Sequence, residues 1–298
     1  MKNIRINIFI LLSSFLFSCS AKTPKTTTDI LEDTVPFEYN PRSYRAILIP
    51  GTLNDSISLR YWLETGTKGV VFSDSLDFDF KKRVLGKKEY KTQKAMKVQI
   101  GQWEQIYRDS ADTYYLDKSQ SIFQWLGYDI AYLPWLFFDQ KIIELSFSKQ
   151  YLRELSDTNG LLGYDSVKIE IENGFLGIPV VASLQGEKIR ELLMFDTGFN
   201  GSIYFDNRMI YKYDIQSDSA IFGKTHGKGG LSPLFAIIAD TIKIGKYFVT
   251  EKHFAYFSLD EECRYPFSGL IGNKVLDNFD LVLDLKNYYL YLKPIEKH

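Results

Sequence analysis

The stretch LLMFDTGFNGSIYF (192–205) decides the fold of this chain. An apolar run ends in an Asp-Thr-Gly triplet (196–198), so a carboxylate stands where a strand gives way to a glycine turn. The first half carries an altered copy, YWLETGTKGVVF (61–72), in which Glu-Thr-Gly (64–66) takes the same place. The two carboxylates are 196 − 64 = 132 residues apart. A carboxylate loop that is used twice predicts two carboxyl groups that meet at a pseudo-symmetric interface.

Composition limits the class of protein. The 298 residues suffice for about two domains, and 45% hydrophobic with 15% aromatic residues can form substantial cores. The net charge of −1 gives no basic footprint, so we expect no nucleic-acid partner. Two cysteines form no disulfide framework. The three histidines show no ligand spacing, so we predict no metal site and no cofactor.

The N-terminus indicates a lipoprotein leader. Lys2 and Arg5 precede a short apolar run (8–17), and the leader ends at Ser18 and Cys19, a pattern that resembles a bacterial lipobox. We predict a signal peptide over 1–18, lipidation of Cys19, and a flexible tether over 19–41. An ordinary signal peptide cut after Ala21, or an uncleaved anchor, are the alternatives. The lipid would hold the chain in the envelope of a Gram-negative cell, on a periplasmic or surface face of the outer membrane.

The rest of the chain predicts an all-β protein. Short runs that are rich in β-branched and alternating apolar residues recur between turn signals from about residue 43 to the end. The best helix candidate is brief and covers 149–156.

A second matched block supports a duplication. LGYDIAYLPWLFFDQKIIELSF begins at Leu126 and IGNKVLDNFDLVLDLKNYYLYL begins at Ile271, and an offset of 272 − 127 = 145 pairs Gly127 with Gly272. A triplet and a later block in the same order predict two homologous lobes, 42–155 and 156–298.

The duplicated triplet and the block SGLIGNKVLDNFDLVLDLKN (268–287) resemble the aspartic peptidases, both pepsin-like and retropepsin-like. The resemblance covers nearly all of the chain after the tether. It implies two pseudo-symmetric all-β lobes with few short helices. In this family an apolar-apolar-Gly segment, here 270–272, crosses behind the Asp-Thr-Gly loop; Trp125-Leu126-Gly127 would do the same in the first lobe.

The resemblance assigns roles to the loop residues. Asp196 would be one catalytic carboxylate and Glu64 its partner, the two sharing one proton while they activate a water. Thr197 would form a hydrogen bond across the lobe interface, and Gly198 would let the backbone approach the carboxylate. In the first loop, Thr65 and Gly66 would support the site in the same way.

Two positions depart from the family pattern. Glu64 adds a methylene where the family has aspartate, which displaces the carboxylate, and a shift of about 1 Å can cost ~100-fold in rate. The family also often places a small hydroxyl residue two positions after the glycine. Lys68 and Asn200 stand there in this chain. Asn200 can still form a hydrogen bond, whereas an inward-pointing Lys68 would hold Glu64 ionised. We expect Lys68 to point to solvent.

Candidate flaps follow each triplet. Gly227, Gly229 and Gly230 form a glycine-rich tip that is either a flap closing over peptide or a plain surface hairpin. In the first half the lysine-rich stretch 81–97 lies where pepsin-like proteins carry a flap. It either favours acidic substrates or headgroups, or is a solvated hairpin. Tyr90 and Trp103 are candidates for an aromatic over the cleft.

Several functions remain open on the sequence. The first is an endopeptidase with a Glu/Asp pair, and the second is a disabled relative that binds extended peptide. A third is a homodimer that pairs two copies of Asp196, and the last is an unrelated envelope-binding lipoprotein. For the first two we expect a monomer whose partners are an extended polypeptide and, through its lipid, a membrane.

Overall fold

A computed structural model describes residues 33–73, 95–107, 113–116, 126–127, 129–217, 220–227, 230–249, 251–260 and 265–296. Residues 33–298 form one compact unit, separate from 1–32. The predicted leader, Cys19, the lysine-rich stretch up to 94, Tyr90 and Gly229 lie outside the described residues. Among those described, no helix is long and apolar enough to cross a membrane.

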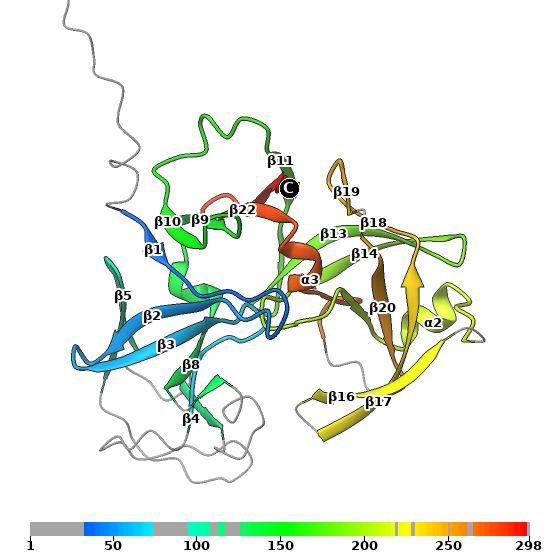
Figure 1. The fold of residues 1–298 in the computed structure, drawn as a ribbon, viewed down its shortest axis with the longest axis horizontal. Coiled ribbons are helices and arrows are strands. Elements are labelled where there is room, and N and C mark those ends of the chain that lie inside the picture. Colours follow the sequence, from blue (N-terminus) through cyan, green and yellow to red (C-terminus); the bar gives the residue numbers. More distant parts are fainter. Residues whose placement is uncertain are drawn as a thin grey trace, which may run out of the picture. The chain divides into compact units, whose positions relative to one another are not determined.

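The described strands form three sheets (Figure 1). The seven-stranded sheet comes from the first half, in the order β6-β5-β2-β3-β8-β4-β7. Its strands are β2 (Leu48–Leu53), β3 (Ile57–Leu63), β4 (Val70–Ser73), β5 (Met96–Ile100), β6 (Trp103–Tyr107), β7 (Thr113–Leu116) and β8 (Ile130–Leu133).

The ten-stranded sheet comes from the second half, in the order β16-β17-β20-β15-β21-β14-β13-β18-β19 with β12 paired to β13. Its strands are β12 (Glu170–Glu172), β13 (Phe175–Leu184), β14 (Glu187–Phe195), β15 (Ile203–Phe205), β16 (Ile221–Gly227), β17 (Gly230–Ala239), β18 (Thr241–Ile244), β19 (Tyr247–Val249), β20 (His253–Ser258) and β21 (Gly269–Ile271).

The six-stranded sheet joins the two halves. Its order is β1-β10-β9-β22-β23-β11, and the antiparallel pair β9–β22 lies at its centre. The strands are β1 (Val35–Pro36), β9 (Ile142–Ser146), β10 (Tyr151–Glu154), β11 (Asp165–Lys168), β22 (Phe279–Asp284) and β23 (Tyr289–Pro294). The described helices are short: η2 (Trp135–Phe138), α2 (Arg208–Lys212) and α3 (Asn273–Leu276). The prediction of an all-β fold with few short helices is confirmed.

The predicted helix over 149–156 is wrong. Tyr151–Glu154 is strand β10, which pairs with β9 on one side and β1 on the other. Its local pattern carried no strong β signal, and the ladder with β9 is a non-local interaction that overrides weak helix propensity.

The two halves repeat one pattern of strand pairing. In the first sheet β3 runs parallel to β8, and β8 runs antiparallel to β4. In the second sheet β14 runs parallel to β21, and β21 runs antiparallel to β15. Leu63 lies opposite Leu133 as Phe195 lies opposite Ile271. Each carboxylate-bearing loop therefore leaves a strand that is held between a hairpin partner and a crossing strand.

The register predicted for the second block is wrong. Leu133 and Ile271 occupy equivalent positions in the two halves and are 271 − 133 = 138 residues apart. The offset predicted from the sequence, which pairs Gly127 with Gly272, is 145 residues. Gly127 lies before β8, while Gly272 directly follows β21. In the second half β21 pairs with β14 and β15 beside the loop, and in the first half β8 pairs in the same way with β3 and β4. Trp125 lies outside the described residues.

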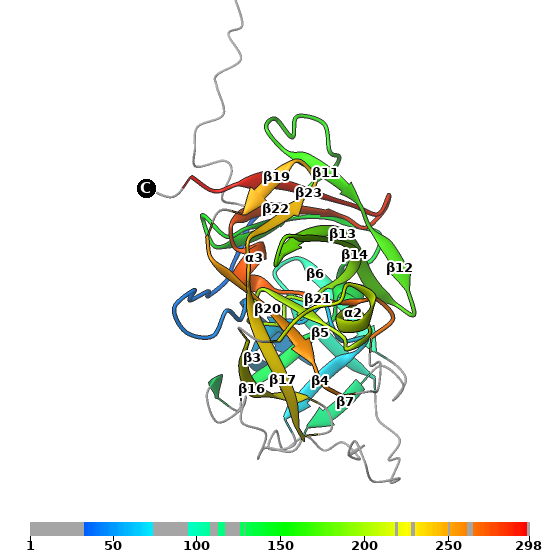
Figure 2. The ribbon, with the colours of Figure 1, turned by 90° about the vertical axis from the view of Figure 1, so that its right-hand side faces the viewer.

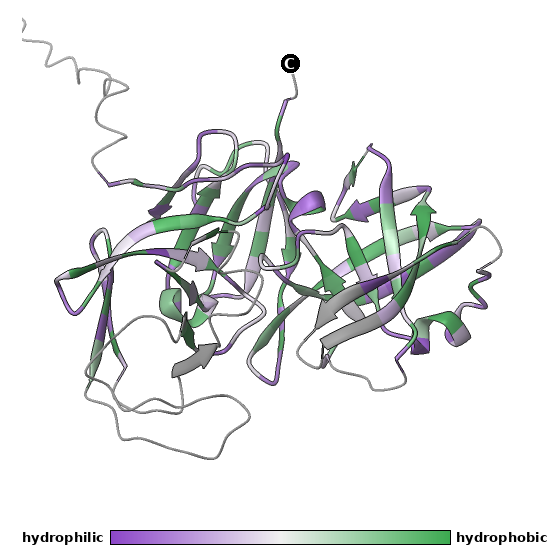
Figure 3. Cartoon of the chain, turned by 60° about the horizontal axis from the view of Figure 1, so that its bottom comes forward, coloured by the Kyte–Doolittle hydropathy of each residue, from purple (hydrophilic) through white to green (hydrophobic). Residues whose placement is uncertain are grey.

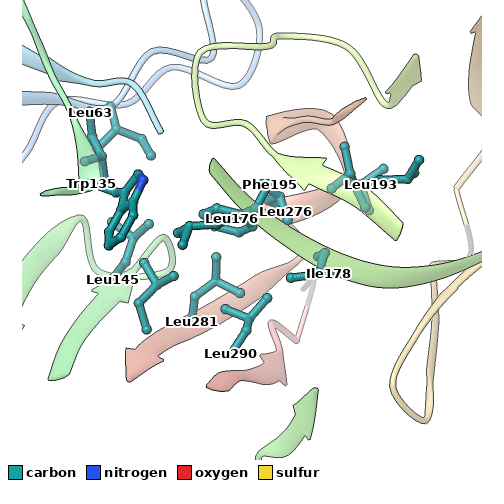
Figure 4. Packing of buried hydrophobic residues seen from close by; sticks show 14 of the residues in the cluster. Leu63, Trp135, Leu145, Leu176, Ile178, Leu193, Phe195, Leu276, Leu281 and Leu290 are labelled. Carbon is teal, nitrogen blue, oxygen red and sulfur yellow. The ribbon is translucent and has the colours of Figure 1, made fainter. Parts of the chain in front are cut away.

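The core lies between the sheets and beneath both loops. Hydrophobic residues concentrate on the strands (Figure 3). Leu63 and Phe195, the last strand residues before each carboxylate, are buried in the same cluster as Leu145 and Leu281 of the joining sheet (Figure 4). Trp135 packs there too. Because both carboxylate strands end in one shared core, their loops are held at a fixed separation.

Candidate active site

The two triplet loops meet through their threonines. Thr65 Oγ1 donates to the Phe195 carbonyl at 2.6 Å, and Thr197 Oγ1 donates to the Leu63 carbonyl at 2.6 Å. In return the Thr65 amide donates to Thr197 Oγ1 at 3.1 Å, and the Thr197 amide donates to Thr65 Oγ1 at 3.0 Å. Both threonines are fully buried. This reciprocal set of four bonds is the cross-interface contact that the sequence predicted for Thr197, and it forms within one chain.

The Thr197 hydroxyl is expected to contribute strongly to the stability of the contact between the two triplet loops. Thr197→Val keeps the shape but leaves the Thr65 amide and the Leu63 carbonyl buried without partners, at about 1–3 kcal/mol each. We expect the variant to lose about 3 kcal/mol in the free energy of unfolding, measured by urea denaturation. The control is Thr241→Val, on an exposed position of β18, which should change it by less than ~0.5 kcal/mol. Equal effects in both variants would contradict the assignment.

The two carboxyl groups come together above this contact. Gly66 N–H donates to Glu64 Oε1 at 3.0 Å, and Gly198 N–H donates to Asp196 Oδ1 at 2.9 Å. Each carboxylate thus accepts the amide two residues further on. The side chains of Glu64 and Asp196 lie within reach of a hydrogen bond to one another, and this interaction acts to lower the pKa of Asp196. Such a bond needs one proton between the two carboxyls, because two carboxylates have only acceptors.

The loop glycines leave room for the carboxylates. A Cβ at Gly198 would lie 1.4 Å from Glu64 Oε2, and one at Gly66 would lie 3.0 Å from Asp196 Oδ1. Each side chain therefore reaches over the glycine of the opposite loop. The extra methylene of Glu64 places its carboxylate directly against Gly198.

Burial raises the pKa of the Asp196 carboxyl above its ordinary value. Hydrogen bonds from Glu64 and from the amides of Gly198 and Phe199 act in the opposite direction without cancelling this effect. Asp196 is 7% exposed, and Glu64 is half-buried. The site thus favours a proton in the pair at a pH where an exposed aspartate is ionised.

Lys68 lies away from the pair, as expected. It is exposed, and its Nζ sits 4.9 Å from the centre of the Phe175 ring. It therefore does not hold Glu64 ionised by direct contact. Asn200 is the other residue at this position of the two loops, and it was expected to support the site through a hydrogen bond. Its Oδ1 is buried and has no hydrogen-bond partner among the described residues, so its supporting role stays a prediction.

Three residues that the sequence did not single out complete the loops. Asn273, at the start of α3, donates through Nδ2 to the Thr197 carbonyl at 2.6 Å and also to the Arg45 carbonyl. Trp62 Nε1 donates to the Thr197 carbonyl at 3.4 Å. Tyr132 lies on β8. Burial raises the pKa of its hydroxyl, and the charge of the nearby Glu64 raises it further. Of these three, only Asn273 had a signal in the sequence, because it is a polar residue directly after the apolar-apolar-Gly segment 270–272.

The other predicted site residues are placed as follows. Gly227 lies opposite Gly230 at the tip of the β16–β17 hairpin, so a hairpin is present and its role as a flap stays a prediction. Trp103 is not an aromatic over the cleft: it is buried and donates to Glu154 Oε2 at 2.9 Å. The described residues contain no group of three or more His, Cys, Asp or Glu that could hold a metal ion.

The fold is similar to that of a solved protease. A retropepsin-like aspartic protease from Rickettsia conorii aligns with 44% of this chain and 89% of its own, at 18% identity and a TM-score of 0.32. No protein-family model matches the chain. No curated protein matches it either.

The geometry limits what the site can do. Two carboxyls that share a proton can accept a proton from water and deliver one to a substrate atom. In the structure Glu64 meets Asp196 within the chain, so the site does not need a second copy to supply its partner carboxylate.

Proposed function

We propose that this chain is an aspartic-type endopeptidase whose catalytic carboxyls are Asp196 and Glu64. The observation that carries the proposal is that the two carboxyls reach over each other's loop: a Cβ at Gly198 would lie 1.4 Å from Glu64 Oε2, and one at Gly66 would lie 3.0 Å from Asp196 Oδ1. The matched amide bonds from Gly66 and Gly198 support it, because they hold both carboxyls in the same pose relative to their loops.

In the proposed reaction the ionised member of the pair takes a proton from a water molecule. The resulting hydroxide attacks the carbonyl carbon of the scissile peptide bond. The protonated member gives its proton to the carbonyl oxygen, which forms a neutral gem-diol. A proton then passes to the amide nitrogen as the C–N bond breaks, and the pair recovers its single shared proton.

The substrate would be an extended polypeptide that lies between the two triplet loops and the β16–β17 hairpin. Backbone hydrogen bonds to strand edges suit such a ligand because they do not depend on its sequence. Gly227, Gly229 and Gly230 would give the hairpin tip the freedom to move over the ligand.

A second candidate function is a disabled relative that binds extended peptide without cleaving it. One observation favours it: the Glu64 carboxylate lies so close to Gly198 that a Cβ there would overlap it. A carboxylate displaced in this way can miss the water position that a shorter side chain would reach.

The proposed setting is the cell envelope. Cys19 would carry the lipid, and the tether over 19–41 would let the folded part reach substrates near the membrane. The partners would be a polypeptide and the membrane that holds the lipid, with the protein acting as a monomer.

The test is cleavage of a diverse peptide library by the full-length chain in detergent, from acidic to neutral pH. We expect the wild type to cleave, and Glu64→Asp to lower the rate about 10- to 100-fold, because the loops hold the longer side chain. The matched control is Glu187→Asp at an exposed position of β14, which should leave the rate unchanged. No cleavage by the wild type, with activity gained in Glu64→Asp, would instead support the binding protein.

A further inference from the structure

A cavity of about 580 Å³ lies on the ten-stranded sheet, apart from the carboxyl pair. Its size is in the range of sites that take a small ligand or a side chain. Residues of β12, β13, β14, the start of α2 and the segment 266–268 line it. Figure 2 shows β12 and α2 near β13 and β14, away from the β16–β17 hairpin of the same sheet.

The cavity shares a sheet face with the approach to Asp196. In the β13–β14 register Pro179 lies opposite Leu192 and Val181 lies opposite Arg190, so these four side chains point to one face. Along β14 the alternation places Met194 on that same face, two residues before Asp196. The rise of a strand puts Leu192 about 13 Å from Asp196.

An apolar layer fills the distance between the two. Met194, Leu192 and Phe267 belong to one hydrophobic cluster. The Phe267 ring lies on Gly177, where a Cβ would come within 2.4 Å of it, and Gly177 is opposite Met194. A peptide that leaves the carboxyl pair along this face therefore meets apolar side chains until it reaches the cavity.

The cavity is lined by both apolar and charged residues, and part of this charge is already paired. Glu191 accepts hydrogen bonds from Tyr213 and Ser268, both at 2.6 Å, and from Lys212. Arg208 is bound to Asp206. Arg190 and Glu172 are exposed at the rim, and neither makes an ion pair among the described residues. Among the apolar lining residues Phe267 is buried, Leu192 is half-buried and Pro179 is exposed. The unpaired charges stand at the edge of the cavity.

We infer that this cavity is a distal subsite that binds an apolar side chain of the polypeptide, about four residues from the scissile bond. This inference rests on the proposed function, because it takes the carboxyl pair as the point of cleavage. Four residues of extended chain span the same 13 Å that separates Leu192 from Asp196. The chemical class of residue is aliphatic or aromatic, because Val181, Leu192 and Phe267 offer apolar surface, while the charged lining residues lie at the rim or are already paired.

The test compares peptides that share one cleaved core. One series carries leucine or phenylalanine four residues to either side of the cleaved bond, and the other carries serine there. For the wild type we expect the apolar residue on one side to raise kcat/KM about 10-fold, mainly through KM. Pro179→Trp, which fills the cavity, should abolish that difference by lowering kcat/KM for the apolar peptide more than for the serine peptide.

The control is Lys188→Trp, an exposed position on β14 outside the cavity, which should keep the difference. No preference at either distal position in the wild type would overturn the inference, as would equal losses on both peptides in Pro179→Trp. Fluorescence anisotropy of labelled peptides gives the same comparison without cleavage. A chain that binds with the apolar preference but never cleaves keeps the subsite and loses the peptidase.

Discussion

Asp196→Asn is expected to abolish peptide cleavage, with kcat lowered about 1,000-fold or more. Asparagine fills the same space but cannot take a proton from water or share one with Glu64. General acid–base groups typically contribute 10²–10⁴-fold, and a pair that acts as a unit loses most of its effect with either member. The measurement is kcat on the best library peptide, at the pH of maximal wild-type activity.

The same variant is expected to be more stable than the wild type at neutral pH. Burial raises the pKa of Asp196, so the folded state holds a proton that the unfolded chain releases near the ordinary value of ~3.9. The contribution of this group is fully present below ~3.9 and is lost as the pH rises through the raised value. Asparagine does not titrate, so the variant keeps its stability as the pH rises. The difference in the free energy of unfolding between Asp196→Asn and the wild type should therefore grow from pH 4 upward.

Opposite changes in activity and stability separate a catalytic carboxylate from a structural one. Urea unfolding between pH 4 and 7.5 gives the stability difference, with Asp240→Asn as the control because Asp240 is exposed. The control should change neither quantity. If Asp196→Asn lost activity together with stability at every pH, the residue would be holding the fold and the proposed chemistry would fail.

The loops were predictable from the sequence because their signal is local. An apolar run, a carboxylate, a threonine and a glycine stand within the seven positions 192–198, and their duplication indicates which residues meet. The strands were predictable for the same reason, since alternation and turn residues are read within short windows.

The register of the second block was not predictable in the same way. A glycine, Gly272, follows the crossing strand β21 in the second half, but in the first half β8 ends at Leu133 and is followed by Pro134. The strand is defined by its ladder with β3, which is a pairing of residues 70 positions apart (133 − 63 = 70). Local composition carries little information on a partner at that distance.

The support from Asn273 was missed for a related reason. Its amide reaches the Thr197 carbonyl and the Arg45 carbonyl, so one side chain links the second loop to a segment from the start of the fold. Both acceptors are backbone atoms, which leave no residue-type signal. Only the three-dimensional arrangement reveals that a buried donor is needed there.

Gly198→Ala is the second change with a large expected effect. A Cβ at this position would lie 1.4 Å from Glu64 Oε2 and 2.1 Å from Glu64 Cδ. Because real atoms do not approach so closely, the Glu64 carboxylate must move away by more than an ångström and break its hydrogen bond with Asp196. A displacement of about 1 Å can cost ~100-fold in rate, so we expect kcat to fall at least that far.

The matched control is Gly223→Ala on β16, where the nearest atom to a new Cβ is Leu234 Cδ1 at 3.7 Å. It should leave cleavage within about twofold of the wild type. The informative further variant is Gly198→Ala combined with Glu64→Asp, because the shorter side chain removes the atoms that the Cβ would strike. Recovery of at least tenfold in the double variant would show that the loss comes from this one contact. A double variant no better than Gly198→Ala would mean that the alanine disturbs the loop itself, and that the position of Glu64 over Gly198 is not what limits the rate.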